Sequence, residues 1–139
     1  MLLDVKNLAV SYAKNSKPTI QGVNFKLDEG KILAIVGESG SGKTTGIRAI
    51  LNVLPGGGKV SEGQIIFNGK DLVKLDEKNW RSLRGKDISM IFQDSGAMMN
   101  PVHTIGKQFV EYIQTHSDLD KKAAYEMAIE KLELMNLPN

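Results

Sequence analysis

The sequence contains no cysteine, which excludes disulfide bonds, thiolate metal ligands and a cysteine nucleophile within its 139 residues. A lack of cysteine fits a reducing cytoplasm. Long apolar runs are missing too: the longest spans residues 32–36, whereas a membrane-spanning helix needs about 20 residues. The acidic Asp4 stands too early for the apolar region of a signal peptide. We therefore expect a chain that is itself soluble and reaches a membrane only through a partner.

An excess of one charge sign is missing as well. The chain has 18 basic and 16 acidic residues, a net charge of +2. Because the basic residues are scattered rather than clustered, we expect no nucleic-acid-binding surface. A hydrophobic fraction of 41% and a charged fraction of 24% are ordinary for a folded domain, and the length suits one domain rather than two.

A glycine-rich segment, Gly37-Glu38-Ser39-Gly40-Ser41-Gly42-Lys43-Thr44, is the most informative pattern. Before it, residues 31–36, which are apolar from Ile32 onward, are bounded by glycine on both sides, which is typical of a strand buried on both faces. After it, apolar residues recur at helical spacing: Ile47, Ile50, Leu51 and Leu54. A strand, then this loop, then a helix is the context of the phosphate-binding motif Gly-x-x-x-x-Gly-Lys-Thr. That context argues against a chance match by a flexible surface loop.

Each position of this phosphate loop, residues 37–44, has its own physical reason. The glycines adopt torsions closed to other residues and let amide groups approach phosphates closely. These amides form an anion-binding concavity at the positive end of the following helix. Lys43 adds a full positive charge for the β- and γ-phosphates, and the Thr44 hydroxyl suits Mg²⁺, which prefers oxygen ligands. We expect a nucleoside triphosphate, ATP in the first place, to bind with Mg²⁺ at Gly37, Glu38, Ser39, Gly40, Ser41, Gly42, Lys43, Thr44 and Thr45. The loop alone does not separate ATPases, GTPases, small-molecule kinases and DNA-repair ATPases.

Periodicity predicts the remaining elements. We expect strands at residues 2–12, 23–27, 31–36, 64–67 and 87–92, and turns at 16–18 and at Asn68-Gly69. Helices are expected from Lys43 until Pro55 and the three glycines after it, at 76–83 with Asp76 as cap, at 104–116 and at 120–137. Trp80 is expected to pack its short helix onto the sheet. The strand-rich first two-thirds and the helical last third indicate an α/β core that leads into a helical lobe.

Three further segments place the phosphate loop in a family. Tyr12 lies 25 residues before Gly37, the segment 61–72 follows the loop helix, and Ile91-Phe92-Gln93-Asp94 precedes Asn100-Pro101. In this order they resemble the ATP-binding subunit of ABC transporters across the whole chain, and most of all the peptide and nickel importer branch. The resemblance implies an α/β P-loop NTPase fold of ABC type. It would comprise an antiparallel β subdomain, an incomplete RecA-like core with the loop (residues 1–94), and the Q-loop region with the start of the helical lobe (95–139).

The resemblance also assigns roles to two residues outside the loop. Tyr12 would stack on adenine, although a half-buried tyrosine at a strand end is the structural alternative. Gln93 would reach Mg²⁺ or the attacking water, with a polar residue that ends a strand as its alternative. Lys43 and Gln93 would then be the catalytic residues, and Thr44 and Gln93 the metal ligands.

Partners follow from the same resemblance. Residues 95–109 would meet the transmembrane permease, and a second ATP-binding subunit would complete a dimer, so that the protein is peripheral on the cytoplasmic face of the membrane. Met98 and Met99 suit an adaptable docking surface or, equally, pack onto the local core. The family pattern has proline after Gln-Asp, whereas this chain has Ser95-Gly96-Ala97.

Other family motifs do not occur in the sequence: the Leu-Ser-Gly-Gly-Gln signature, the Asp-Glu pair that ends the Walker B strand, and the switch histidine. We therefore expect either an engineered or proteolytic fragment, which we favour, or a naturally truncated gene, and in both cases a chain that covers the N-terminal portion of the family domain. Such a fragment should bind ATP weakly and hydrolyse it at little above background, because the general base and the partner's signature are missing. The strands at 31–36 and 87–92 would have open edges, which favour self-association or rearrangement of residues 87–139.

Two other functions remain open at this stage. One is a nucleotide-binding or regulatory module that does not hydrolyse ATP. The other is a DNA-repair-type ATPase of the same superfamily, which would need a zinc module, a coiled coil or a basic groove, and the sequence has none of these. A GTPase is disfavoured because no Asn-Lys-x-Asp base-reading motif occurs.

Overall fold

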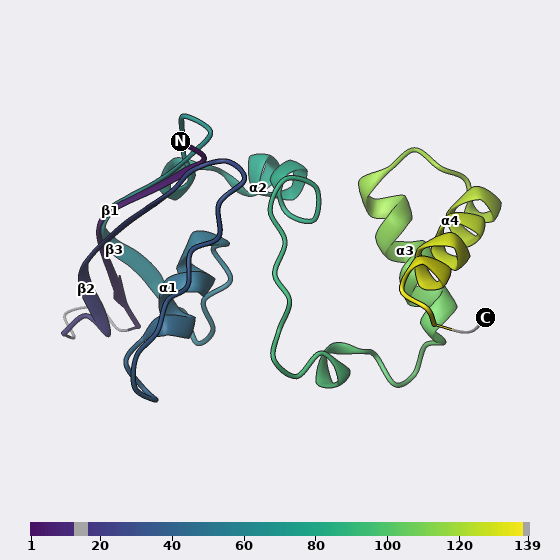
Figure 1. The fold of residues 1–139 in the computed structure, drawn as a ribbon, viewed down its shortest axis with the longest axis horizontal. Coiled ribbons are helices and arrows are strands. Elements are labelled where there is room, and N and C mark those ends of the chain that lie inside the picture. Colours follow the sequence, from purple (N-terminus) through teal and green to yellow (C-terminus); the bar gives the residue numbers. More distant parts are fainter. Residues whose placement is uncertain (13–16, 138–139) are drawn as a thin grey trace. The chain divides into compact units, whose positions relative to one another are not determined.

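The computed structural model describes residues 1–12 and 17–137, which form two units, one up to Arg81 and one from Ser82 onward (Figure 1). The first unit contains β1 (Leu3–Ser11), β2 (Ile20–Leu27), α1 (Lys43–Ile50), β3 (Lys59–Phe67), β4 (Lys70–Asp71) and the 3₁₀ turn η1 (Leu72–Lys74). Helix α2 (Glu77–Leu83) spans the division between the units. The second unit contains the 3₁₀ turn η2 (Gly96–Met98), α3 (Ile105–His116) and α4 (Lys121–Leu134).

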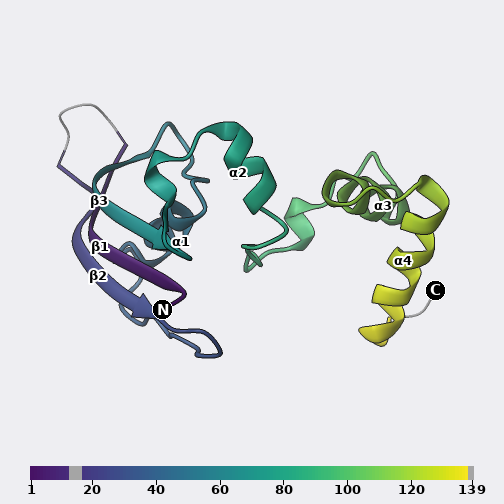
Figure 2. The same cartoon turned by 90° about the horizontal axis from the view of Figure 1, so that it is seen from above.

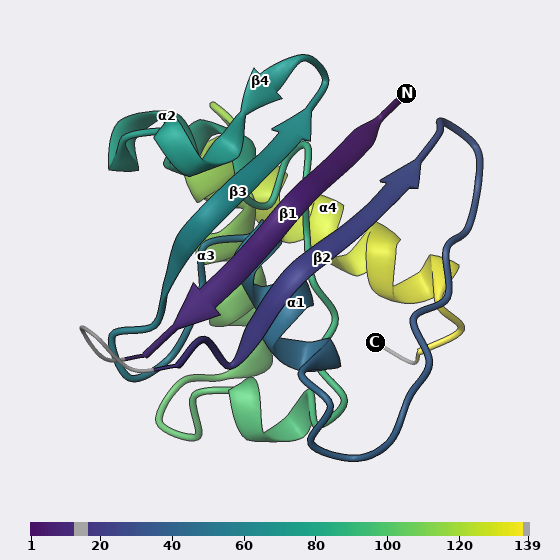
Figure 3. The same cartoon turned by 90° about the vertical axis from the view of Figure 1, so that its left-hand side faces the viewer.

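The first unit is built on an antiparallel sheet with the strand order β2-β1-β3-β4 (Figure 3). Strand β1 is central and contributes the buried side chains Leu3, Val5, Leu8, Ala9 and Val10. It pairs with β3 in a register that sets Ser11 opposite Lys59 and Val10 opposite Val60. The turn predicted at Asn68-Gly69 is confirmed, since both residues have positive φ (46° and 78°), as a tight hairpin between β3 and β4 requires.

Two helices complete the core of the first unit. Helix α1 packs against β1 and β3 and buries Ala49 and Ile50 (Figure 2). Helix α2 begins after Asp76, whose carboxylate Oδ1 accepts a hydrogen bond from the backbone amide of Asn79 (2.8 Å). The prediction that Trp80 packs its short helix onto the sheet is confirmed, because the residue is only 2% exposed and lines a small hollow together with Val60 and Ile65 of β3.

Two predicted strands, 31–36 and 87–92, are not strands in the structure. Residues 31–36 are irregular chain, with Ile32 98% and Val36 87% exposed. Of residues 87–92, only Ile88 makes a bridge, with Arg84, while Ile91 is 92% exposed. A strand buried on both faces gains its hydrogen bonds and its burial from neighbouring strands. Apart from the isolated Arg84–Ile88 bridge, no strand within the described residues pairs with these segments, so their apolar character alone does not fix them as strands.

The second unit is a pair of helices whose ends the sequence predicts well. Thr104 caps α3 by accepting a hydrogen bond from the amide of Lys107 (3.3 Å), and Asp120 caps α4 through the amide of Ala123 (2.8 Å). The helices pack against each other around the buried Val110, Ala124 and Ala128. Helix α4 ends at Leu134, before the predicted end at 137.

Membrane-spanning helices are not found among the described residues, since none of these helices is both long and apolar enough. Of the turn predicted at 16–18, residue Ser16 lies outside the part of the chain that the structure describes.

Gly46, inside α1, gives a stability prediction. Its backbone is helical, and a Cβ there would lie 3.8 Å from Ile20 Cδ1, an ordinary van der Waals contact. Because alanine is the better helix former, Gly46→Ala should raise the free energy of unfolding by about 0.5–1 kcal/mol. Urea denaturation followed by the fluorescence of Trp80 measures this change. Gly40→Ala is the opposite case, since its φ of 80° is unfavourable for alanine. A loss of stability in Gly46→Ala would contradict the helix at this position.

Candidate functional site

The phosphate loop is followed directly by α1, and the residue that joins them has a left-handed backbone conformation. Gly42, the N-cap of α1, has φ 91°, and Gly40 has φ 80°. The amide of Ser41 donates to the carbonyl oxygen of Glu38 (3.2 Å), which closes the turn inside the loop. A Cβ on Gly42 would also overlap the Ile20 side chain. Both the torsion and the close approach of Ile20 therefore require glycine at position 42.

The Lys43 ammonium group is held above the loop by the loop itself. Its Nζ donates to the carbonyl oxygens of Gly37 (2.8 Å) and Glu38 (2.6 Å), and lies 3.4 Å from Ser41 Oγ. An ammonium group has three donors, and the longest of these three contacts is at the limit of a hydrogen bond. One donor is thus available for a phosphate oxygen without a loss of the two short bonds.

The N-terminus of α1 is suited to an anion. The N-cap Gly42 makes no side-chain hydrogen bond to the helix, and the first turn contains no acidic residue. The first amides of a helix have no acceptor within it and carry its partial positive charge. With the Lys43 ammonium beside them, these amides form a site of positive potential at an exposed loop. That is the arrangement that phosphate groups bind.

Tyr12 follows the end of β1 and is half-buried. Its ring lies against Gly58, because a Cβ on that glycine would be 2.6 Å from Tyr12 Cε1. The sequence pattern indicates only that the glycines after Pro55 end a helix and gives no sign of this contact. The pairing of β1 with β3 reveals it.

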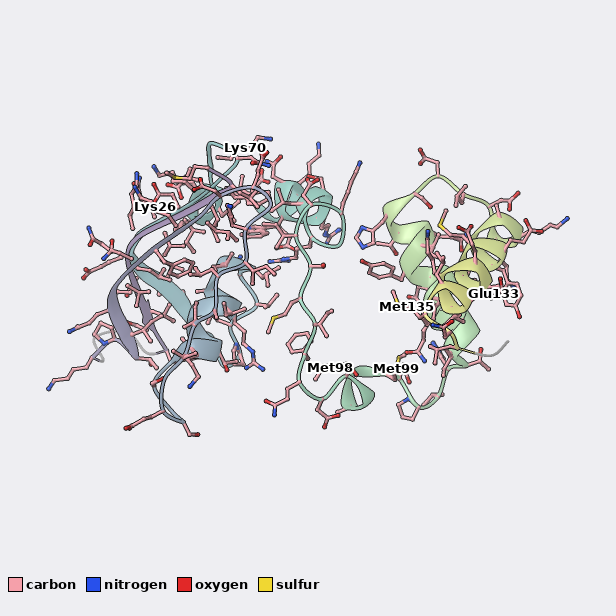
Figure 4. All side chains as sticks on the ribbon, in the orientation of Figure 1. Lys26, Lys70, Met98, Met99, Glu133 and Met135 are labelled. Atoms are coloured by element: carbon pink, nitrogen blue, oxygen red, sulfur yellow. The ribbon has the colours of Figure 1, made fainter. Side chains whose placement is uncertain are left out.

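Gln93 and the segment 95–109 belong to the second unit. Gln93 is exposed in a bend, and its role as a metal and water ligand stays a prediction. Gln108 ties the segment to α3, since its side chain accepts from the amide of Asn100 (2.9 Å) and donates to the carbonyl oxygens of Asn100 (3.1 Å) and His103 (3.0 Å). Met98 and Met99 are 61% and 44% exposed rather than packed in a core (Figure 4).

A large hollow in the second unit lies away from the phosphate loop. It is a groove of about 990 Å³ on α3 and α4, with Lys107, Glu111, Lys121 and Tyr125 in its lining. Its charged side chains have both signs, and the helix N-termini in or beside it, those of α3 and α4, are capped by the side chains of Thr104 and Asp120, whereas the N-terminus of α1 has no side-chain cap. We place the nucleotide site at the loop for that reason. No group of three or more His, Asp or Glu side chains within the described residues could hold a metal ion.

Comparison with known proteins decides the family. The sequence profile of the ABC transporter family matches residues 20–139. This chain belongs to the ABC transporter family. Over 140 residues it is 47% identical to the oligopeptide transport ATP-binding protein OppD of Bacillus subtilis, a match that covers 99% of the chain and 39% of that protein. It is 41% identical to the dipeptide transport ATP-binding protein DppD of Bacillus subtilis, covering 99% of the chain and 42% of the relative.

Solved structures agree on the fold. An ATP-binding cassette dimer in a post-hydrolysis state, bound to ADP and Pi, superposes with a TM-score of 0.77 at 20% identity, over 99% of this chain and 59% of that one. The predicted P-loop NTPase fold of ABC type is confirmed, as is the resemblance to peptide-transport ATP-binding proteins. This family member spans about two fifths of the length of the curated relatives it matches. The division at residue 94 and the nickel branch stay predictions.

Proposed function

We propose that this ABC family member binds ATP with Mg²⁺ at the phosphate loop, as the nucleotide-binding portion of the energy-coupling subunit of a peptide importer. The observation that carries the proposal is the Lys43 ammonium, held by two loop carbonyls beside the uncapped N-terminus of α1. The relatives are oligopeptide and dipeptide transport ATP-binding proteins, which favours peptides over nickel as cargo.

Different residues of this site would bind different parts of the nucleotide. The loop amides and Lys43 would bind the β- and γ-phosphates, Tyr12 would stack on adenine, and Thr44 with Gln93 would bind the cation. Mg²⁺, when bound, neutralises charge on the phosphate oxygens. Thr44 is exposed at the first turn of α1, so its hydroxyl can reach a ligand from solvent without any rearrangement of the core.

Partners and location follow as part of the same proposal. Residues 95–109, which include the exposed Met98 and Met99, would contact a transmembrane permease, since exposed thioethers adapt to varied surfaces. A second ATP-binding subunit would complete the dimer, in line with the dimeric cassette of similar fold. The protein would then lie on the cytoplasmic face of the membrane, attached through the permease.

Isothermal titration calorimetry of the 139-residue chain tests the proposal. We expect one ATP per chain in the presence of Mg²⁺, competition by ADP, and no competition by AMP, which lacks the β- and γ-phosphates that Lys43 and the loop amides bind. Phosphate release should stay near background, because the 139 residues contain no Walker B strand that ends in an Asp-Glu pair after the loop, and no signature motif. Competition by AMP as strong as that by ADP would contradict a phosphate-directed site, and rapid steady-state phosphate release would contradict the expected slow turnover.

A further inference from the structure

Three glycines follow Pro55, and the backbone explains only two of them. Gly56 and Gly57 have φ of 60° and 74°, and the amide of Gly58 donates to the carbonyl oxygen of Pro55 (3.1 Å). Two successive left-handed residues inside such a hydrogen-bonded turn define a type I′ turn, which needs glycine, asparagine or aspartate at both positions. Gly58 is not in the left-handed region. Its lack of a side chain therefore requires a different reason.

That reason is the Tyr12 ring. The antiparallel register of β1 with β3 pairs Ser11 with Lys59. The residue after Ser11, Tyr12, and the residue before Lys59, Gly58, therefore lie opposite each other at the ends of these two strands. A Cβ on Gly58 would lie 2.6 Å from Tyr12 Cε1 and 2.8 Å from Cδ1, the two closest approaches, and 3.1 Å from Leu54 Cβ. Carbon atoms rest about 3.5–4.0 Å apart, so any side chain at position 58 would displace the ring by roughly 1 Å.

We propose that Gly58 is a positioning residue for the nucleotide: it allows the Tyr12 ring to settle on the backbone of the 55–58 turn, in the place from which the ring stacks on adenine. The inference rests on the proposed function, since it concerns the adenine side of the same site. Glycine at a strand end is less favourable for stability than alanine or valine. The packing of the Tyr12 ring against Gly58 offsets that cost. Tyr12 is only partly buried, so the residue is still accessible to a base.

The Gly58→Ala variant of the 139-residue chain shows whether position 58 affects recognition of the base or binding of the phosphates. Titrations with ATP and with inorganic tripolyphosphate, which has no base, are compared by calorimetry. We expect ATP to bind roughly 5- to 100-fold more weakly, the range that loss of one stacked base produces. Tripolyphosphate should change by less than about two-fold, because the loop is untouched. Gly46→Ala is the matched control, the same chemical change in the same unit, and should alter neither affinity.

A double-mutant cycle shows whether Gly58 acts through Tyr12. Tyr12→Ala should weaken ATP binding, and Gly58→Ala added to it should cause no further loss, because the two closest contacts of the new Cβ are gone and the remaining one, 3.1 Å to Leu54 Cβ, involves no group that binds the base. Equal weakening of ATP and tripolyphosphate by Gly58→Ala, no weakening of ATP, or a further loss in the Tyr12→Ala background would each overturn the inference.

Folding and the proposed function are checked in the same experiment. If circular dichroism shows that Gly58→Ala is unfolded, the double variant must fold again, and a double variant that stays unfolded overturns the inference. A wild-type chain that binds neither ATP nor tripolyphosphate overturns the proposed function together with this inference. A wild-type chain that binds ATP while Gly58→Ala binds it equally well overturns this inference alone.

Discussion

Lys43→Ala is expected to weaken ATP binding by about 100-fold. The ammonium would make charge-assisted hydrogen bonds to phosphate oxygens, each worth about 1.5–3 kcal/mol, and about 3 kcal/mol corresponds to a change of roughly 150-fold. The substitution also removes the two bonds that join the ammonium to the carbonyl oxygens of Gly37 and Glu38. Calorimetric titration with ATP and Mg²⁺ measures the loss.

Lys70→Ala is the matched control for this prediction. It removes the same charge from the same unit, at an exposed residue of β4 (Figure 4). If both variants lost affinity equally, the net charge of the chain rather than the phosphate loop would determine binding. An unchanged affinity for ATP in Lys43→Ala would show that the lysine does not contribute to the site.

Trp80→Ala is expected to lower the free energy of unfolding by about 3–5 kcal/mol, as large-to-small substitutions of buried aromatic residues do. Trp80 lines a small internal hollow together with Ala49 of α1, Ile65 of β3 and Leu72 of η1. Its removal would leave a cavity among these elements, which position the phosphate loop through α1. The total free energy of unfolding of a small domain is only about 5–15 kcal/mol. The substitution would therefore remove a substantial fraction of the stability.

Urea denaturation followed by circular dichroism measures this loss, since the variant has no tryptophan left to report by fluorescence. Trp80→Phe keeps much of the ring volume and should cost less than Trp80→Ala. A loss below about 1 kcal/mol in Trp80→Ala would be the size expected for a surface position and would contradict the packing described for α2.

Local signals explain which parts of the fold were predictable from the sequence. Asp76, Thr104 and Asp120 each accept a hydrogen bond from the amide of the third residue of the following helix. The donor and the acceptor that start each helix are thus only three positions apart in the sequence. The Asn68-Gly69 hairpin is local in the same way. The strands expected at 31–36 and 87–92 depend instead on partners far away in sequence, and an apolar run indicates burial without identifying what covers it.

The same distinction holds for the candidate site. The loop, the lysine and the uncapped helix N-terminus lie within a few residues of one another, and the motif predicts them together. The Tyr12–Gly58 contact joins residues 46 positions apart. It follows from the pairing of β1 with β3, which the composition of either strand does not reveal.

The most direct test of ATP binding at the phosphate loop is a ¹H–¹⁵N NMR titration of the 139-residue chain with ATP and Mg²⁺. The account predicts that the largest shifts occur at the amides of Gly40, Gly42, Lys43 and Thr44, with smaller shifts at Gly58 beside the Tyr12 ring. Residues of α4 should stay unchanged. Shifts confined to the α3–α4 groove, or no saturable shift at the loop amides, would contradict it.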